Sequence, residues 1–136
     1  MSYSRQEDEA AINAMLADAY KAWEANDAEA FVTNYNADAT AILPGSLRAG
    51  RDVIRETKAQ GFHGPLKGSS TYNTQLSLRY LGDHGAIVVS ESGILFAGET
   101  EVPEPRKINA TWVLEKRDGE WKIAAYHNSP ANAPAH

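Results

Sequence analysis

The chain contains no cysteine among its 136 residues, which excludes disulfides, thiolate metal ligands and catalytic thiols. It also lacks long apolar runs, and no stretch approaches the roughly 18 residues that a membrane-spanning helix needs. Basic residues are few and scattered: 13 Lys and Arg stand against 18 Asp and Glu, for a net charge of −5. Because nucleic-acid-binding domains usually carry a basic stripe, we expect neither nucleic acid nor a membrane as a partner. The four histidines show no metal-ligand spacing, so no metal site is expected.

The remaining composition, with 43% hydrophobic and 23% charged residues, is typical of one compact domain. A chain of this length buries about two-thirds of its unfolded surface, so it needs no disulfide or metal for stability. We predict a single domain over residues 1–136, with a core of about residues 5–129 and an Ala- and Pro-rich tail at 130–136. The first residues hold no apolar signal core, which together with the missing cysteine predicts a cytoplasmic protein.

Helical periodicity is confined to the first part of the chain. Ser4 and Glu7 have the spacing of a capping box and precede apolar residues that recur on one helical face. That face consists of Ile12, Met15, Leu16, Ala19, Tyr20 and Trp23. Asn26 is a predicted left-handed stop and Asp27 the cap of a second helix. A third helix is predicted from about Arg51 to Gln60, with a weak apolar face formed chiefly by Val53 and Ile54. Arg48, Arg51 and Arg55 around its start are interpreted as a solvated face rather than an anion site.

The second half of the chain alternates with the period of β-strands. After a short strand at Ala39–Leu43, strands are predicted at Tyr72–Tyr80, Ala86–Phe96, Ile108–Glu115 and Trp121–Asn128. Asp118-Gly119 is a strong hairpin signal, and Gly93 is a candidate site for a bulge. Helices followed by long strands predict an α+β domain. We expect a curved antiparallel or mixed sheet that wraps the N-terminal helices as a cone with an internal apolar pocket.

This order of elements resembles the nuclear transport factor 2-like superfamily. The segments that carry the resemblance are Asn34–Thr40, the helix start at Gly50-Arg51 and the hairpin at Asp118–Ile123. The closing segment Ala124–Pro130 is similar, more narrowly, to a SnoaL-related subfamily that accompanies natural-product clusters, including those for enediyne polyketides. The resemblance implies a homodimer formed through the outer sheet faces and a hydrophobic ligand such as a polyketide or polyene. No glycine fingerprint for a dinucleotide is present, so no cofactor is expected.

Ketosteroid isomerases of this superfamily use a Tyr and a protonated Asp as oxyanion donors and an Asp as base. Matching their motifs to this chain places the three roles at Ala19, Trp112 and Leu43, so the Tyr and both Asp residues are absent. The Arg-x-Asp pattern of limonene epoxide hydrolases is also missing, because Arg79 is followed by Tyr and Leu. We therefore do not expect the chemistry of either enzyme.

Two titratable residues are the candidate catalytic acid–base groups, Glu91 and His127. If the residues at 87, 89, 91 and 93 face inward, Glu91 lies in the cone and burial raises its pKa. Otherwise Glu91 lies on the outer face, solvated or paired with Arg79. His127 titrates near neutrality without perturbation. Strand alternation puts His127 inside together with Trp121, whereas alignment to the isomerase strand puts the Tyr126–Asn128 face inside, and a bulge would reconcile the two.

The candidate ligand-binding residues are mostly aromatic side chains that a hollow fold turns toward its cavity. They are Trp23, Tyr35, Leu43, Phe62, Trp112, Tyr126 and Asn128. Three functions remain open: a small-molecule binding protein, a cofactor-free isomerase, cyclase or dehydratase, and an oligomerisation module with a vestigial pocket. Two titratable side chains that converge in the cavity would favour the enzyme.

Overall fold

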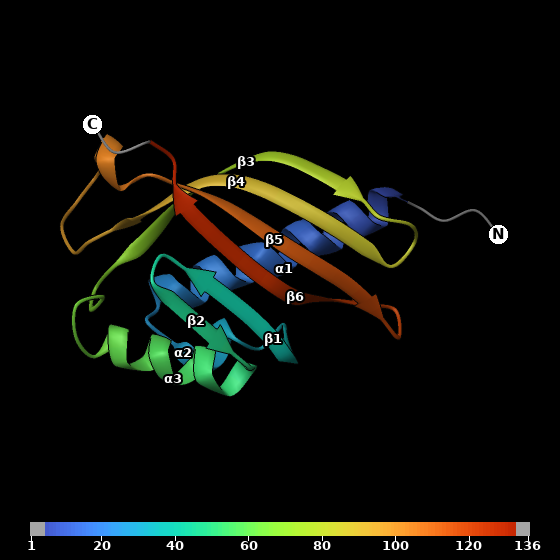
Figure 1. Cartoon of the computed structure of the whole chain (residues 1–136), viewed down its shortest axis with the longest axis horizontal. Helices are drawn as coiled ribbons and strands as arrows, with labels where there is room; N and C mark the ends of the chain where they lie inside the picture. The colour runs from blue at the N-terminus through green and yellow to red at the C-terminus, as the bar shows by residue number, and fades with distance from the viewer. Residues whose placement is uncertain (1–4, 133–136) are drawn as a thin grey trace.

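A computed structural model describes residues 5–132 as a curved sheet packed against helices (Figure 1). The helices are α1 (Arg5–Glu24), α2 (Ala28–Phe31), α3 (Arg51–Phe62) and the 3₁₀ turn η1 (Glu104–Arg106). The strands are β1 (Tyr35–Leu43), β2 (Ser46–Ala49), β3 (Ser70–Tyr80), β4 (Gly85–Leu95), β5 (Ile108–Arg117) and β6 (Glu120–Pro130). The predicted α+β class is confirmed. Ser4 of the predicted capping box and residues 133–136 of the predicted tail lie outside the described residues.

The six strands form one mixed sheet in the order β2-β1-β6-β5-β4-β3. β1 pairs in parallel with β6, and every other neighbouring pair is antiparallel. Figure 1 shows α1 along one face of the long strands, with α2 and α3 gathered beside β1 and β2. The helices therefore cover the concave face of the sheet and leave its outer face open.

The periodic face of α1 is buried as the sequence predicts. Ile12, Met15, Leu16, Ala19 and Trp23 are all buried in the core. Asn26 ends the helix with a φ of 54°, the left-handed conformation that asparagine tolerates. The carboxylate of Asp27 accepts a hydrogen bond from the Ala30 amide at 3.1 Å and so caps α2, which is a single turn.

A buried carboxylate, which the sequence analysis did not single out, fastens the start of α1 to the sheet. Asp8 is 3% exposed, and its Oδ1 accepts hydrogen bonds from Trp121 Nε1 at 2.9 Å and Lys116 Nζ at 3.1 Å. A charge on a buried helix face is tolerated only with such partners. The β5–β6 hairpin supplies both, so it fixes where α1 begins on the sheet.

A bulge at Ala124 reverses which residues of β6 face the core. Leu114 pairs with Ile123, whereas the preceding Val113 pairs with Ala125, so Ala124 is an extra residue. Trp121 and Ile123 are buried before the bulge, and Asn128 is buried after it. Both predicted orientations of this strand are therefore correct, each for one half of it.

Of the two orientations considered for β4, the one that turns residues 87, 89, 91 and 93 inward is wrong. Ala86, Val88, Ser90 and Ser92 are the buried positions, so the apolar side chains at 87 and 89 lie on the other face. Gly93 marks no bulge, because the β3–β4 register shifts instead between Gln75 and Ser77. A Cβ at Gly93 would lie 2.6 Å from Val102 Cγ1, so the close approach of Val102 is what requires glycine there.

Candidate functional site

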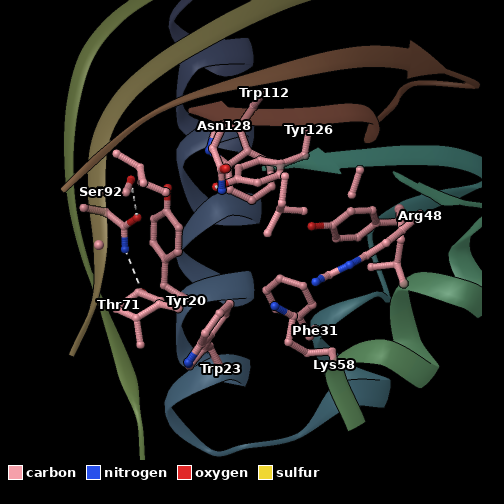
Figure 2. A pocket seen from close by; sticks show the side chains of 18 residues that line it. Tyr20, Trp23, Phe31, Arg48, Lys58, Thr71, Ser92, Trp112, Tyr126 and Asn128 are labelled. Carbon is pink, nitrogen blue, oxygen red and sulfur yellow. Dashed lines mark hydrogen bonds between the residues drawn. The ribbon is translucent and has the colours of Figure 1, made fainter. Parts of the chain in front are cut away.

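A pocket opens between α1, α3 and the concave face of the sheet (Figure 2). Its volume is about 90 Å³. This volume is several times what a single water molecule needs, so the pocket has room for part of a small organic molecule. Six aromatic side chains dominate its wall: Tyr20, Trp23, Phe31, Tyr35, Trp112 and Tyr126.

These aromatic side chains form two groups, and the rings within each group are in contact. Trp112 packs on Tyr126 with ring centroids 4.5 Å apart, and Tyr20 meets Trp112 edge to face at 6.3 Å. In the other group, Phe31 lies 5.7 Å from both Trp23 and Tyr35. Such tilted and edge contacts hold each ring in place and leave ring faces for a flat ligand.

Two polar atoms in the wall are buried without a hydrogen-bond partner among the described residues: Trp112 Nε1 and Asn128 Oδ1. The amide of Asn128 is oriented, because its Nδ2 donates to the Tyr126 hydroxyl at 2.9 Å. Buried polar atoms are nearly always satisfied. Each of these atoms has less than 1 Å² of accessible surface, so a ligand reaches them only if the wall around them shifts.

Three other polar residues of the wall, Thr71, Asn73 and Ser92, are paired with one another. Ser92 Oγ donates to Asn73 Oδ1 at 3.0 Å, and Asn73 Nδ2 donates to Thr71 Oγ1 at 2.8 Å, as the dashed lines of Figure 2 show. These two hydrogen bonds join β3 to β4, so the three side chains hold the wall in place rather than offer free groups to a ligand.

The three tyrosines of the wall keep their protons at neutral pH. Burial, reinforced by the nearby Tyr126, raises the pKa of Tyr20 to about 12. Burial also raises the pKa of Tyr35 and that of Tyr126. All three hydroxyls are therefore neutral hydrogen-bonding groups and not bases.

Two basic residues line the pocket, and none of its lining residues is Asp or Glu. Lys58 of α3 is 6% exposed, and its Nζ lies 3.9 Å from the centroid of the Trp23 ring. Burial, with a smaller contribution from Arg48, lowers the pKa of Lys58 to about 7. Arg48 extends from β2, where its Nε donates to Ser46 Oγ at 3.3 Å, and burial lowers its pKa too.

The sequence analysis missed Lys58 and misplaced Arg48 on a solvated face. The available signal was spacing, because Lys58 lies four residues from both Ile54 and Phe62 on the buried stripe of α3. Val53, predicted for that stripe, is 43% exposed. Arg55 does lie on the surface, where it pairs with Glu29 and Asp52.

Six of the seven predicted ligand-binding residues lie in the pocket wall. They are Trp23, Tyr35, Leu43, Trp112, Tyr126 and Asn128, and their contact with a ligand stays a prediction. Phe62 is buried but does not line the pocket: it packs behind Trp23, with ring centroids 5.6 Å apart.

Both predicted catalytic residues lie outside the pocket. His127 is exposed, because the bulge at Ala124 turns it to the outer face while its neighbours Tyr126 and Asn128 turn inward. Glu91 lies on the outer face because the inward positions of β4 are its even-numbered neighbours. Its carboxylate accepts from the Tyr72 hydroxyl at 3.4 Å and lies 3.9 Å from Lys107 Nζ, so its partner is not Arg79.

Within residues 5–132, no three His, Asp or Glu side chains gather closely enough to hold a metal ion. No helix in this part of the chain is both long and apolar enough to cross a membrane.

The model of the SnoaL-like domain matches residues 12–133. The chain belongs to the SnoaL-like domain family. Comparison with curated proteins gives no significant match. Among solved structures, this SnoaL-like domain is similar to a domain of unknown function with a cystatin-like fold from Nostoc punctiforme. The two share 24% identity over 96% of this chain and 81% of the other, with a TM-score of 0.87.

Two further structures show the same fold at lower similarity. An NTF-2-like protein of unknown function from Shewanella oneidensis has 22% identity over 90% of this chain and 98% of its own, with a TM-score of 0.76. A ketosteroid isomerase-like protein from Erwinia carotovora has 21% identity over 91% and 96%, with a TM-score of 0.71. The predicted fold family is therefore confirmed. In this SnoaL-like domain, the positions matched to the isomerase roles are a buried Ala19 and the wall residues Leu43 and Trp112.

Proposed function

We propose that this SnoaL-like domain binds a mostly apolar small molecule, a polyketide or polyene intermediate of natural-product biosynthesis. The observation that carries the proposal is the wall of six aromatic side chains around the pocket. Flat conjugated ligands stack on such rings, and a few polar groups fix their orientation. The hydroxyls of Tyr20, Tyr35 and Tyr126 are the neutral polar groups of the wall that serve this purpose. The resemblance of Ala124–Pro130 to the enediyne-associated subfamily supports the same ligand class.

Identification of a co-purified ligand tests this proposal most directly. The protein, purified from its own producer and analysed by native mass spectrometry, should carry a conjugated small molecule in a one-to-one ratio to the chain. Denaturation should release that molecule for identification. Protein from the producer that carries no small molecule, and binds none from an extract of the same cells, would contradict the proposal.

A matched pair of substitutions in β6 tests the pocket with a defined neutral probe, 2-naphthamide. Asn128→Leu keeps the bulk and removes the amide that fixes the Tyr126 hydroxyl in the wall, so we expect a loss of about 0.5–1.5 kcal/mol in binding, the net contribution of one hydrogen bond. His127→Gln changes the neighbouring outward residue and should leave the affinity unchanged. Isothermal titration calorimetry measures both. Equal effects of the two substitutions would show that the probe does not bind in this pocket.

A cofactor-free isomerase, cyclase or dehydratase is the second candidate function, and one observation favours it. Lys58 has a pKa of about 7 and shares the pocket with the Tyr20, Tyr35 and Tyr126 hydroxyls. An amine of that pKa accepts a proton from an acidic C–H or O–H at neutral pH. Turnover of the co-purified molecule by the protein alone, lost in Lys58→Met, would support catalysis over binding.

We also expect a homodimer formed through the outer face of the sheet. Asn109, which is exposed, and Thr111 and Val113, which are half-buried, lie on this face. Tyr126 does not contribute to it, because its side chain turns into the pocket. Ile42 and Leu47 are cross-strand neighbours and are 42% and 69% exposed. Light scattering at micromolar concentration should give twice the mass of one chain. A single-chain mass would contradict this prediction.

A further inference from the structure

Lys58 and Arg48 bring two basic side chains into a pocket that has no lining carboxylate. Figure 2 shows both side chains extending into the cavity from the side of β2 and α3. Within residues 5–132, Lys58 makes no hydrogen bond or ion pair, and Arg48 uses only Nε in a hydrogen bond, to Ser46. The ammonium group and the outer guanidinium nitrogens are therefore free to bind a ligand.

The fold does little to offset the charge on Lys58. Its Nζ lies 3.9 Å from the centroid of the Trp23 ring and 5.3 Å from that of Phe31, and such cation–π contacts replace only part of the lost hydration. The nearest charged group in the wall, Arg48, is itself a cation and lowers the pKa of Lys58 further. A methionine would fill the same place on the stripe between Ile54 and Phe62 without this cost. The position of Lys58 is thus explained by a negative charge that arrives from outside the chain.

We propose that the pocket binds an acidic conjugated ligand whose oxyanion, a carboxylate or an enolate, lies between Lys58 and Arg48. The planar guanidinium suits such an oxyanion because it donates two parallel hydrogen bonds. The conjugated body then lies along Trp112 and Tyr126 in the same cavity. This inference rests on the proposed function and narrows it, from any apolar polyketide or polyene to one that carries an acidic group.

Binding of an oxyanion should be linked to proton uptake by Lys58. The groups that face Lys58 are Arg48 from β2, Trp23 from α1 and Phe31 from α2, and no Asp or Glu lines the pocket. An anion placed beside the amine favours its charged form and raises its pKa. At pH 8 the free protein holds this lysine mostly neutral, since its pKa is about 7. The complex should therefore take up as much as about one proton per ligand.

The experiment compares two probes of the same shape, 2-naphthoate and its neutral amide, by calorimetry at pH 6.5. We expect the wild type to bind naphthoate at least about 10-fold more tightly than naphthamide. Lys58→Met should lose this preference while its affinity for naphthamide stays within about 3-fold. Arg55→Met removes a positive charge from the surface of the same helix and should keep the preference. In the wild type at pH 8, titrations in phosphate and in Tris should reveal the proton uptake, a readout that needs no variant.

The outcomes separate the two proposals. Naphthamide that binds as tightly as naphthoate, with no proton uptake, overturns the acidic ligand and leaves the apolar pocket standing. A naphthoate preference that survives in Lys58→Met also overturns it. Failure of both probes to bind the wild type overturns the oxyanion subsite together with the pocket that contains it.

Discussion

Lys58→Met is expected to stabilise the free protein by roughly 3–5 kcal/mol below pH 7. The pKa of this lysine falls from 10.5 to about 7 on folding because its ammonium group is buried. Each unit of that change in pKa corresponds to about 1.4 kcal/mol of lost stability for the charged form. Methionine is apolar, flexible and similar in length, so it fits between Ile54 and Phe62 without the charge. The gain appears only in the absence of an anionic ligand.

The size of this gain should depend on pH in a defined direction. Because the folded pKa of Lys58 is the lower one, the unfolded chain binds more protons between about pH 7 and 10.5. The loss in the free energy of unfolding caused by burying this charge therefore shrinks as the pH rises through that window. Below the window the loss is complete. Urea unfolding of wild type and Lys58→Met at pH 6, 7, 8 and 9 should show a gap that narrows as the pH rises. A gap of constant size, or equal stability at pH 6, would contradict the burial of a charged lysine.

Trp112→Ala should have a similarly large effect in the opposite direction, a loss of about 3–5 kcal/mol in the free energy of unfolding. Trp112 is 4% exposed, and its ring packs between Tyr126 at 4.5 Å and Tyr20 at 6.3 Å. Its Nε1 lies near the Tyr20 hydroxyl, and most of the expected loss comes from packing and from the enlarged cavity.

The neighbouring residue provides the control for this substitution. Thr111 is half-buried on the outer face of β5, so Thr111→Ala should change stability by no more than about 0.5 kcal/mol. Chemical denaturation measures both variants under the same conditions. A loss of less than about 1 kcal/mol for Trp112→Ala, below the usual cost of truncating a core aromatic residue, would show that the wall does not depend on this ring.

The two substitutions point to a conflict between stability and binding in one pocket. Trp112 contributes to stability and to binding, because its ring is packed in the core and also lines the pocket. Lys58 weakens the folded state and is useful only when an anion is bound. Residues that lower stability at a site are typical of functional positions, so Lys58 is the side chain whose removal should best separate folding from ligand binding.

The parts of the fold that could be predicted from the sequence are those with a single strong local signal. The buried face of α1 follows from 3.6-residue periodicity, which only one orientation of the helix satisfies. Asn26 and Asp118-Gly119 adopt positive φ angles, as their residue types predict. Most pocket-lining aromatic residues were also found, because in a hollow domain the residues that face the core become the wall of the cavity.

Strand orientation was harder to predict because alternation alone fixes only relative faces. In β4 the side chains at 87 and 89 are as apolar as those at 86 and 88, so the residue types do not distinguish the two faces. In β6 the extra residue lies within Ala124-Ala125, where two identical small side chains conceal it. A shift of one residue exchanges every inward and outward position, and this is how His127 and Glu91 came to be assigned to the pocket.

Arg48 and Lys58 were missed for a different reason. A lone basic residue in a polar segment is most often solvated, and neither position has a sequence motif. β2 itself exists because Ser46–Ala49 pairs with β1, so the inward direction of Arg48 depends on a contact between strands. Lys58 has the spacing of the buried face of α3, but which face of this helix is buried becomes clear only from how it packs.

The parallel pair of β1 and β6 has a consequence for how the protein is made. It joins Tyr35 to Ile123 and Ile42 to His127, residues separated by most of the chain, and such non-local pairing makes folding slow. On the ribosome, β1, β2 and α3 emerge long before the strand on which they dock, so the nascent chain holds their apolar faces uncovered. The pocket, which needs Tyr126 and Asn128, does not exist until the last strand has been synthesised. Ligand binding therefore requires synthesis through β6, and a product truncated before this strand should have no binding activity.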